Sequence, residues 1–121
     1  VFEGKIDSAS GIDAAERLLA SKVPATAVVA AADILAIGAM KGFYERGVRV
    51  PDDISVMGFD DLEISQYLTP GLSTIHQEIS QKGEKAVELL INNIKEPNLT
   101  KQEQILPVKL VERGSVKCIG G

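Results

Sequence analysis

Apolar residues in this chain follow two patterns, short continuous runs and longer stretches at helical spacing. Residues 26–31 are almost all small and apolar, which is typical of a strand buried on both faces of a parallel sheet. Strands are predicted in this way at residues 1–3, 26–31, 54–59, 72–76 and 105–111. Helical spacing predicts helices from Ser10 to near Pro24, from Asp33 to near Gly47, as a short turn over 62–67, and over 78–95.

Capping residues indicate where these helices begin and end. Ser10 and Asp33 are the predicted N-caps of the first two helices, because short polar side chains satisfy free N–H groups there. Gly47 is placed to follow the last turn of the second helix. Gly83 lies on the apolar face of the helix over 78–95. Glycine costs about 1 kcal/mol relative to alanine inside a helix, so Gly83 indicates close packing.

Strands separated by helices of this length predict right-handed crossovers and an α/β fold with a doubly wound, mostly parallel sheet. In such sheets, ligands bind beyond the carboxyl ends of the strands, near the point where the strand order reverses. That rule selects residues 4–7, 31–33 and 59–61 as the candidate binding segments.

Composition and charge exclude several classes of protein. The 121 residues are 45% hydrophobic and 25% charged, as in ordinary soluble domains. They are too few for a complete two-lobed core that closes on a ligand. Thirteen basic and 17 acidic residues give a formal net charge of −4. Binding to a phosphate backbone relies on clustered Lys and Arg, so this chain is not expected to hold nucleic acid itself.

Candidate chemistry is sparse. Cys118 and His76 are the only cysteine and histidine, so neither a disulfide nor a metal site is expected. His76 has no nucleophile and oriented base around it in the sequence pattern, which favours a structural role and no catalysis. No cofactor motif, signal peptide or membrane-length apolar run is present. A reducing cytoplasm is expected, and the start at Val1 suggests a fragment.

Three stretches carry a family resemblance. The first is PATAVVAAAD over 24–33, followed by AIGA over 36–39. The second is GVRVPDDISVMGFDD over 47–61. The third is PGLSTIHQ over 70–77, followed by Gly83, Leu106-Pro107 and Arg113-Gly114-Ser115. In order and spacing they resemble the LacI/GalR family of bacterial transcriptional regulators over nearly the whole chain.

The resemblance implies part of a larger protein. A full member has a DNA-reading head, a hinge helix and a two-lobed core similar to periplasmic binding proteins. Residues 1–76 would be part of the C-terminal lobe, 77–97 a helix of the N-terminal lobe, and 98–121 the return to the C-terminal lobe and the tail. The function implied is a ligand-responsive repressor, with operator DNA bound only by the head, which this chain lacks.

Asp60 is the strongest candidate site residue. It lies at the end of the predicted strand 54–59, where a carboxylate can accept hydrogen bonds from vicinal hydroxyls or a purine edge. Gly58-Phe59-Asp60-Asp61 resembles the family's Gly-aromatic-Asp-Asp/Asn pattern, whose first Asp contacts the ligand. The alternative is a turn-forming or capping Asp, and that structural role is favoured for Asp61.

Two positions depart from the pattern of sugar-responsive members. Ala32 stands where many have an Asn that bonds the effector, and Ile6 stands where an aromatic ring is common. Ile6 supplies apolar contact without a π surface, or is a plain aliphatic residue. Asp33 is an effector contact or the helix N-cap. The resemblance therefore implies an altered pocket for a sugar or nucleobase-like effector, formed by Asp60, Ile6, Ala32 and Asp33.

The family also implies a homodimer, since two heads must span two operator half-sites. Ile37 and Leu68 are the candidate interface residues; the alternative is packing against their own sheet. A periplasmic sugar-binding protein of a transport system shares the core fold and is an alternative function. A doubly wound enzyme is a weaker one, because the chain shows no phosphate loop and no catalytic set.

Overall fold

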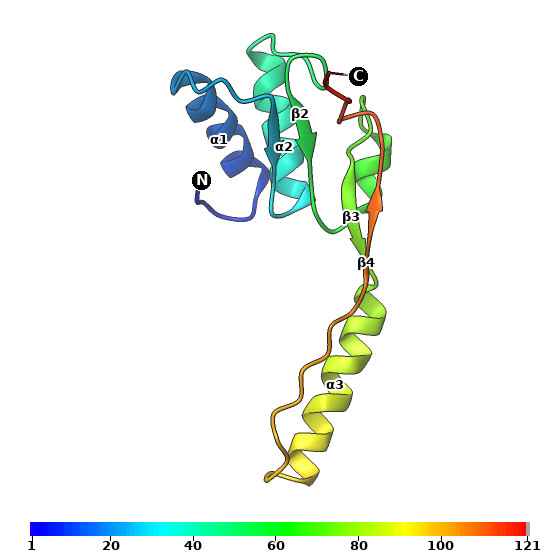
Figure 1. The fold of residues 1–121 in the computed structure, drawn as a ribbon. Helices are drawn as coiled ribbons and strands as arrows, with labels where there is room; N and C mark the ends of the chain where they lie inside the picture. Colours follow the sequence, from blue (N-terminus) through cyan, green and yellow to red (C-terminus); the bar gives the residue numbers. More distant parts are fainter. Residues whose placement is uncertain (121) are drawn as a thin grey trace. The chain divides into compact units, whose positions relative to one another are not determined.

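A computed structural model describes residues 1–120 of the chain (Figure 1). In order, its elements are α1 (Ser8–Ala20), β1 (Ala27–Val29), α2 (Asp33–Glu45), β2 (Ser55–Met57), the 3₁₀ helix η1 (Glu63–Tyr67), β3 (Thr74–Gln77), α3 (Ile79–Lys95) and β4 (Val108–Val111). The chain divides into two compact units. The first unit holds Val1–His76 and the segment from Leu110 onward, and the second holds Gln77–Lys109.

The first unit is built on parallel strands. β1 and β2 pair in parallel, with Val28 opposite Val56. Met57 and Ser73 form a further parallel bridge on the other side of β2, and Asp60 and His76 form another. β3 itself pairs with β4 in a second two-stranded sheet, at the point where the chain leaves and re-enters the first unit. The α/β fold class with a mostly parallel sheet is confirmed.

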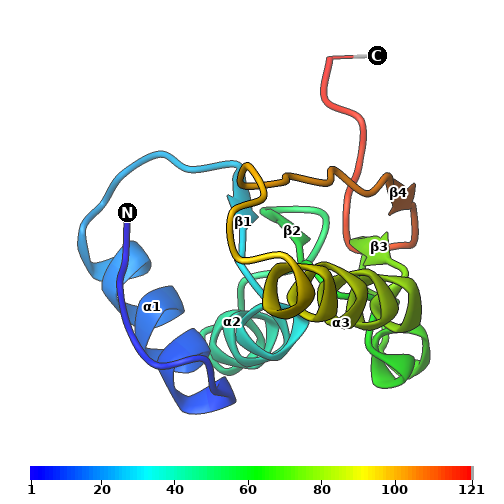
Figure 2. The same ribbon diagram turned by 90° about the horizontal axis from the view of Figure 1, so that it is seen from below.

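Helices α1 and α2 lie side by side (Figures 1 and 2), and glycines bring their backbones into contact. A Cβ added at Gly38 would lie 2.1 Å from the Ser8 carbonyl oxygen, and one at Gly11 would lie 2.2 Å from the Leu35 carbonyl oxygen. No larger residue fits such a crossing without a shift of the backbone. At the other end of the pair, Arg46 donates to Glu16 at 2.8 Å.

The hydrophobic core lies where these helices meet the sheet. It combines small residues of the helices with larger side chains of α2, of β2 and of the residues just before β2 and β3. Its buried members are Ala15, Ala36, Ala39, Phe43, Ile54, Val56 and Leu72. Phe43 and Val56 are fully buried, so the end of α2 packs directly onto the middle of β2.

The predicted end of α2 is confirmed, but the predicted N-caps of α1 and α2 are wrong. Gly47 follows the C-cap Arg46 with φ +72°, as predicted. The N-cap prediction for Ser10 is wrong: Asp7 caps α1, and its carboxylate accepts the Ser10 N–H at 2.7 Å. This hydrogen bond holds the pKa of Asp7 below its ordinary value. The N-cap prediction for Asp33 is also wrong, because Ala32 occupies that position and Asp33 is the first helical residue.

β1 is less buried than its continuous hydrophobicity predicts. Val29 is 77% exposed, and residues 1–3 form no strand beside it, contrary to the prediction. Within residues 1–120, β1 pairs with β2 alone. A hollow of about 700 Å³ lies between residues 27–31 on one side and the N-terminal segment with α1 on the other. The exposure of β1 follows from this missing neighbour.

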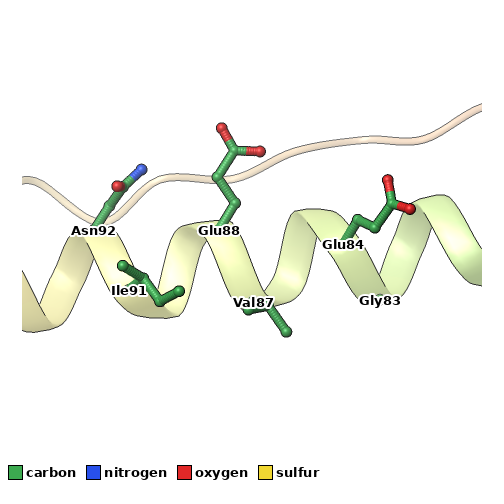
Figure 3. Close-up of a pocket in the computed structure, with 6 residues that line it drawn as sticks. All are labelled: Gly83, Glu84, Val87, Glu88, Ile91 and Asn92. Atoms are coloured by element: carbon green, nitrogen blue, oxygen red, sulfur yellow. The ribbon is translucent and has the colours of Figure 1, made fainter.

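The second unit contains α3, which confirms the helix predicted over 78–95. None of its residues is buried, and its apolar side chains are exposed at Ile79, Val87, Leu90, Ile91 and Ile94. Glu84 and Glu88 extend from one side of the helix and Val87 from the other (Figure 3). The prediction of close packing at Gly83 is wrong, since an added Cβ would meet no atom of the described chain within 4 Å.

Candidate functional site

The parallel sheet brings two of the three predicted binding segments together. The Ala30 N–H donates to the Met57 carbonyl at 2.8 Å, and the Asp33 N–H donates to the Phe59 carbonyl at 2.7 Å. Both contacts lie at the carboxyl ends of β1 and β2. Residues 31–33 and 59–61 therefore form one continuous rim at this edge of the sheet.

The third segment lies at the start of α1. α1 runs in the same direction as α2, because Gly11 approaches Leu35 and Gly38 while Ile12 and Ala15 approach Gly42. The two helices therefore begin at the same edge, and Ile6 comes two residues before α1. Ile6 is 72% exposed. It presents apolar surface near the beginning of the helix pair.

Asp60 has an unusual backbone conformation. Its φ is +114°, and Asp61 follows with φ +53°. Such values are rare for residues other than glycine, cost on the order of 1–3 kcal/mol each, and gather at ligand sites. The turn is held from β3, since the Asp60 N–H donates to the Ile75 carbonyl at 3.0 Å. Asp60 is partly exposed, at the carboxyl end of β2.

Asp61 binds one side chain from β3 and one from the segment that follows β4. Its Oδ1 accepts from Nη2 of Arg113 at 2.8 Å, and its Oδ2 lies 3.0 Å from Nδ1 of His76. Arg113 also donates through Nη1 to the Leu72 carbonyl at 2.8 Å. Burial raises the pKa of Asp61, but the hydrogen bonds from Arg113 and His76 outweigh it and hold the pKa below its ordinary value. The structural role predicted for Asp61 and His76 fits these contacts.

Asp33 is fully buried and bonds inward rather than toward the rim. Its Oδ1 accepts from the Thr74 hydroxyl at 2.5 Å, and its Oδ2 accepts from the Ser65 hydroxyl at 2.5 Å and the Leu62 N–H at 2.8 Å. Ser65 and Thr74 were missed by the sequence analysis. No pattern marks them, because each is an isolated hydroxyl in a different element.

The remaining predicted residues lie in or against the core. Ala32 is only 6% exposed, so it contributes a methyl group and its backbone to the rim. Ile37 and Leu68 are partly buried and pack against the core cluster. This is the core-packing alternative considered for these two residues, and their role in a dimer stays a prediction.

Residues 1–120 contain neither a cluster of metal ligands nor a helix that could span a membrane. No group of three or more His, Cys, Asp and Glu in that range is placed to hold a metal ion. In the same range, no helix combines the length and apolar character needed to cross a membrane. A hollow of about 550 Å³ lies on α3 against Gly83, Val87 and Ile91, and Asp60 lines neither this hollow nor the one beside β1.

Comparison with known proteins gives a consistent family. The periplasmic binding protein-like domain matches residues 2–116. The chain is 46% identical over 116 residues to the "Probable HTH-type transcriptional repressor ExuR" of Bacillus subtilis, covering 95% of this chain and 34% of that protein. It is 38% identical over 112 residues to the "Ribose operon repressor" of Escherichia coli, covering 93% and 34%. The chain thus spans about a third of the length of these relatives.

Solved structures of LacI-family regulators are also similar to this chain. A LacI family transcriptional regulator from Enterococcus faecalis V583 with bound ribose is 34% identical, with a TM-score of 0.82 over 94% of this chain and 42% of that one. The lac repressor dimer bound to operator and the anti-inducer ONPF is 36% identical, with a TM-score of 0.85 over 96% and 40%. The chain therefore belongs to the periplasmic binding protein-like domain family, in the form found in LacI-family transcriptional regulators.

Proposed function

We propose that this chain is part of the effector-binding and dimerisation core of a ligand-responsive transcriptional repressor, with Asp60 as the principal ligand contact. The observation that carries this assignment is the strained backbone of Asp60, φ +114°, at the carboxyl end of β2. Strain of this kind persists where the surrounding structure enforces it. The rim position is also where ligands bind in open α/β sheets.

The proposed ligand is a small polar molecule of the sugar or nucleobase-like class. The Asp60 carboxylate offers acceptors for vicinal hydroxyls, and relatives are known with bound ribose. Ala32 places a methyl group on the rim and Ile6 an exposed aliphatic side chain. The pocket therefore recognises an apolar face as well as hydroxyls, with fewer polar contacts from this half of the site than an Asn at position 32 would give.

The domain assignment follows the same reasoning. Residues 1–76 form part of the C-terminal lobe, 77–97 contribute a helix to the N-terminal lobe, and 98–121 are the return to the C-terminal lobe and the tail. Effector bound between two lobes would favour one lobe arrangement over another, by as much as its affinities for the two states differ. Asp61 holds His76 and Arg113, which flank the two crossings, and so ties both crossings to the rim.

The proposed partners are a second copy of the protein and operator DNA. Ile37 and Leu68 are the proposed interface residues. DNA would be bound by a head outside this chain, since the net charge here is −4 and phosphate contacts need clustered basic residues. The relatives compared above are named repressors, which supports a cytoplasmic regulator without catalytic activity over a periplasmic transport protein.

The test is calorimetry on the full-length protein. D-ribose, other monosaccharides and free nucleobases are titrated into the wild type and into Asp60→Ala. We expect the affinity for the ligand that binds to fall about tenfold or more in Asp60→Ala, since charge-assisted hydrogen bonds contribute about 1.5–3 kcal/mol each. Asp52→Ala, an exposed carboxylate beside Arg49, is the matched control. Undiminished binding by Asp60→Ala contradicts the assignment.

A further inference from the structure

The buried carboxylate of Asp33 is unusual in its partners. It is fully buried in the first unit, and its three donors, Leu62 N–H and the hydroxyls of Ser65 and Thr74, are all uncharged. Burying a carboxylate is costly unless hydrogen bonds compensate for the lost water. Three short hydrogen bonds meet that requirement, so the geometry around Asp33 is closely constrained.

Hydrogen bonds of Asp33, made by its backbone and by its side chain, hold the chain on both sides of Asp60. Before Asp60, the Phe59 carbonyl accepts the Asp33 N–H at 2.7 Å. After it, Leu62 and Ser65 donate to the Asp33 side chain. A Cβ added at the neighbouring Gly58 would lie 2.3 Å from the Asp33 Oδ1, so the strand end lies directly against this carboxylate.

Thr74 extends the connection to Asp61. Its hydroxyl donates to Asp33 at 2.5 Å and accepts the Asp61 N–H at 3.3 Å. A hydroxyl has one hydrogen and can rotate, and the Asp33 carboxylate fixes that hydrogen toward itself. The lone pairs of the oxygen are then available to the amide of Asp61, the second residue of the Asp60-Asp61 turn, in which both residues have positive φ.

We propose that Asp33 is a positioning residue of the effector site: through the hydroxyls of Ser65 and Thr74 it holds the strained Asp60-Asp61 turn in the conformation that binds ligand. This inference rests on the proposed function for its effect on ligand affinity, but not for its effect on the turn. It also gives Asp33 a role apart from direct effector contact, because its carboxylate oxygens bond inward.

The test changes the Thr74 hydroxyl without changing the size of the side chain. Thr74→Val removes the donor and acceptor, Thr74→Ser keeps them, and Asp33→Asn removes the charge. Phe43→Leu destabilises the core at the far end of α2 and serves as the control for stability. Backbone amide exchange of Asp60 and Asp61 is measured by NMR in the full-length protein, and affinity for D-ribose and the other ligands of the panel by calorimetry.

We expect the Asp60 and Asp61 amides to exchange about tenfold faster or more in Thr74→Val and Asp33→Asn, as the loss of a buried hydrogen bond predicts. Thr74→Ser keeps the hydroxyl and is expected to leave both amides as protected from exchange as in the wild type. Phe43→Leu is expected to change exchange across the core without singling out these two amides. Affinity for the bound ligand should fall in the same order as protection is lost.

The outcomes separate the two proposals. If the amides in Thr74→Val exchange as in the wild type, or if Phe43→Leu reproduces the effect, the positioning role is overturned. If exchange follows the hydroxyl but the wild type binds no ligand of the panel, the positioning of the turn stands and the proposed sugar or nucleobase class fails. If exchange follows the hydroxyl while affinity does not, the link from turn to ligand binding is overturned.

Discussion

Helices α2 and α3 differ in how sequence pattern relates to burial. α2 carries apolar residues around most of its surface and buries six residues, among them Gly38 and Phe43. α3 has the clearer apolar stripe, yet none of its residues is buried. An apolar stripe thus identifies a helix and the side that gains from contact, but it does not supply the contacting surface. Contact in α2 comes from small residues that let α1 and the sheet approach.

Substitutions made in pairs, one in α2 and one in α3, test this comparison. The largest difference in stability between the two helices is expected for large apolar residues. Phe43→Ala should destabilise the first unit by about 3–5 kcal/mol, because it leaves a cavity in a closely packed core. Leu90→Ala in α3, where the side chain is more than half exposed, should change stability by within about 0.5 kcal/mol. Hydrogen exchange measured on peptides of each helix reports the two effects separately. A similar cost at both positions would show that a covering surface forms over α3.

The same small change at two glycines should have opposite signs. Gly38→Ala places a methyl group against the Ser8 carbonyl, 2.1 Å from the added Cβ, and should destabilise by about 1–3 kcal/mol through overpacking. Gly83→Ala meets open space and should stabilise α3 by about 0.5–1 kcal/mol, since alanine is the better helix former. Denaturant unfolding curves followed by circular dichroism measure both. A stabilising Gly38→Ala would contradict the backbone contact between α1 and α2, and a destabilising Gly83→Ala would contradict the open space beside Gly83.

Ion pairs give the smallest and most pH-dependent difference. The Asp61 carboxylate, 18% exposed, pairs with Arg113; Glu88, 56% exposed, pairs with Lys85 in α3. Asp61→Asn should cost about 1–2 kcal/mol at neutral pH, and Glu88→Gln within about 0.5 kcal/mol.

The sign of the pH dependence follows from the lowered pKa of Asp61. The stabilisation is complete above the ordinary Asp pKa of about 3.9 and is lost as the pH falls through the lower value in the folded protein. The stability difference between wild type and Asp61→Asn should therefore shrink as the pH falls below about 4. A difference that does not shrink below about pH 4 would assign the stabilisation to another group.

Sequence reasoning predicted the elements better than their ends. Every predicted helix is present, since spacing and turn residues are local signals. Ser10 was predicted as the cap of α1, where Asp7 is the cap. Both are good capping residues, and which of them caps the helix depends on the backbone conformation of the preceding loop. The predictions of a strand at residues 1–3 and of a buried β1 failed for a different reason. Both required a neighbouring strand, which a local pattern cannot supply.

The candidate site shows the same division. Asp60 was predicted as a site residue because it follows a strand in a family-like motif, and its positive φ was not visible in the sequence. The partners of Asp33 and Asp61 were missed. Ser65, Thr74 and Arg113 lie 32, 41 and 52 residues from the carboxylates they bind. Contacts at such separations depend on how the sheet is ordered, and no spacing rule in one sequence encodes them.

The backbone contact between Gly11 and Gly38 has a mechanical consequence. Where side chains separate two helices, rotamer changes absorb a small displacement; here no side chain lies between the two backbones. A displacement of one helix is therefore passed to the other with little loss. The ion pair of Arg46 with Glu16 joins the two helices again toward their other ends. Since both helices start at the rim, we expect α1 and α2 to move together, so that a displacement at the rim is passed on to the helix ends at Ala20 and Glu45.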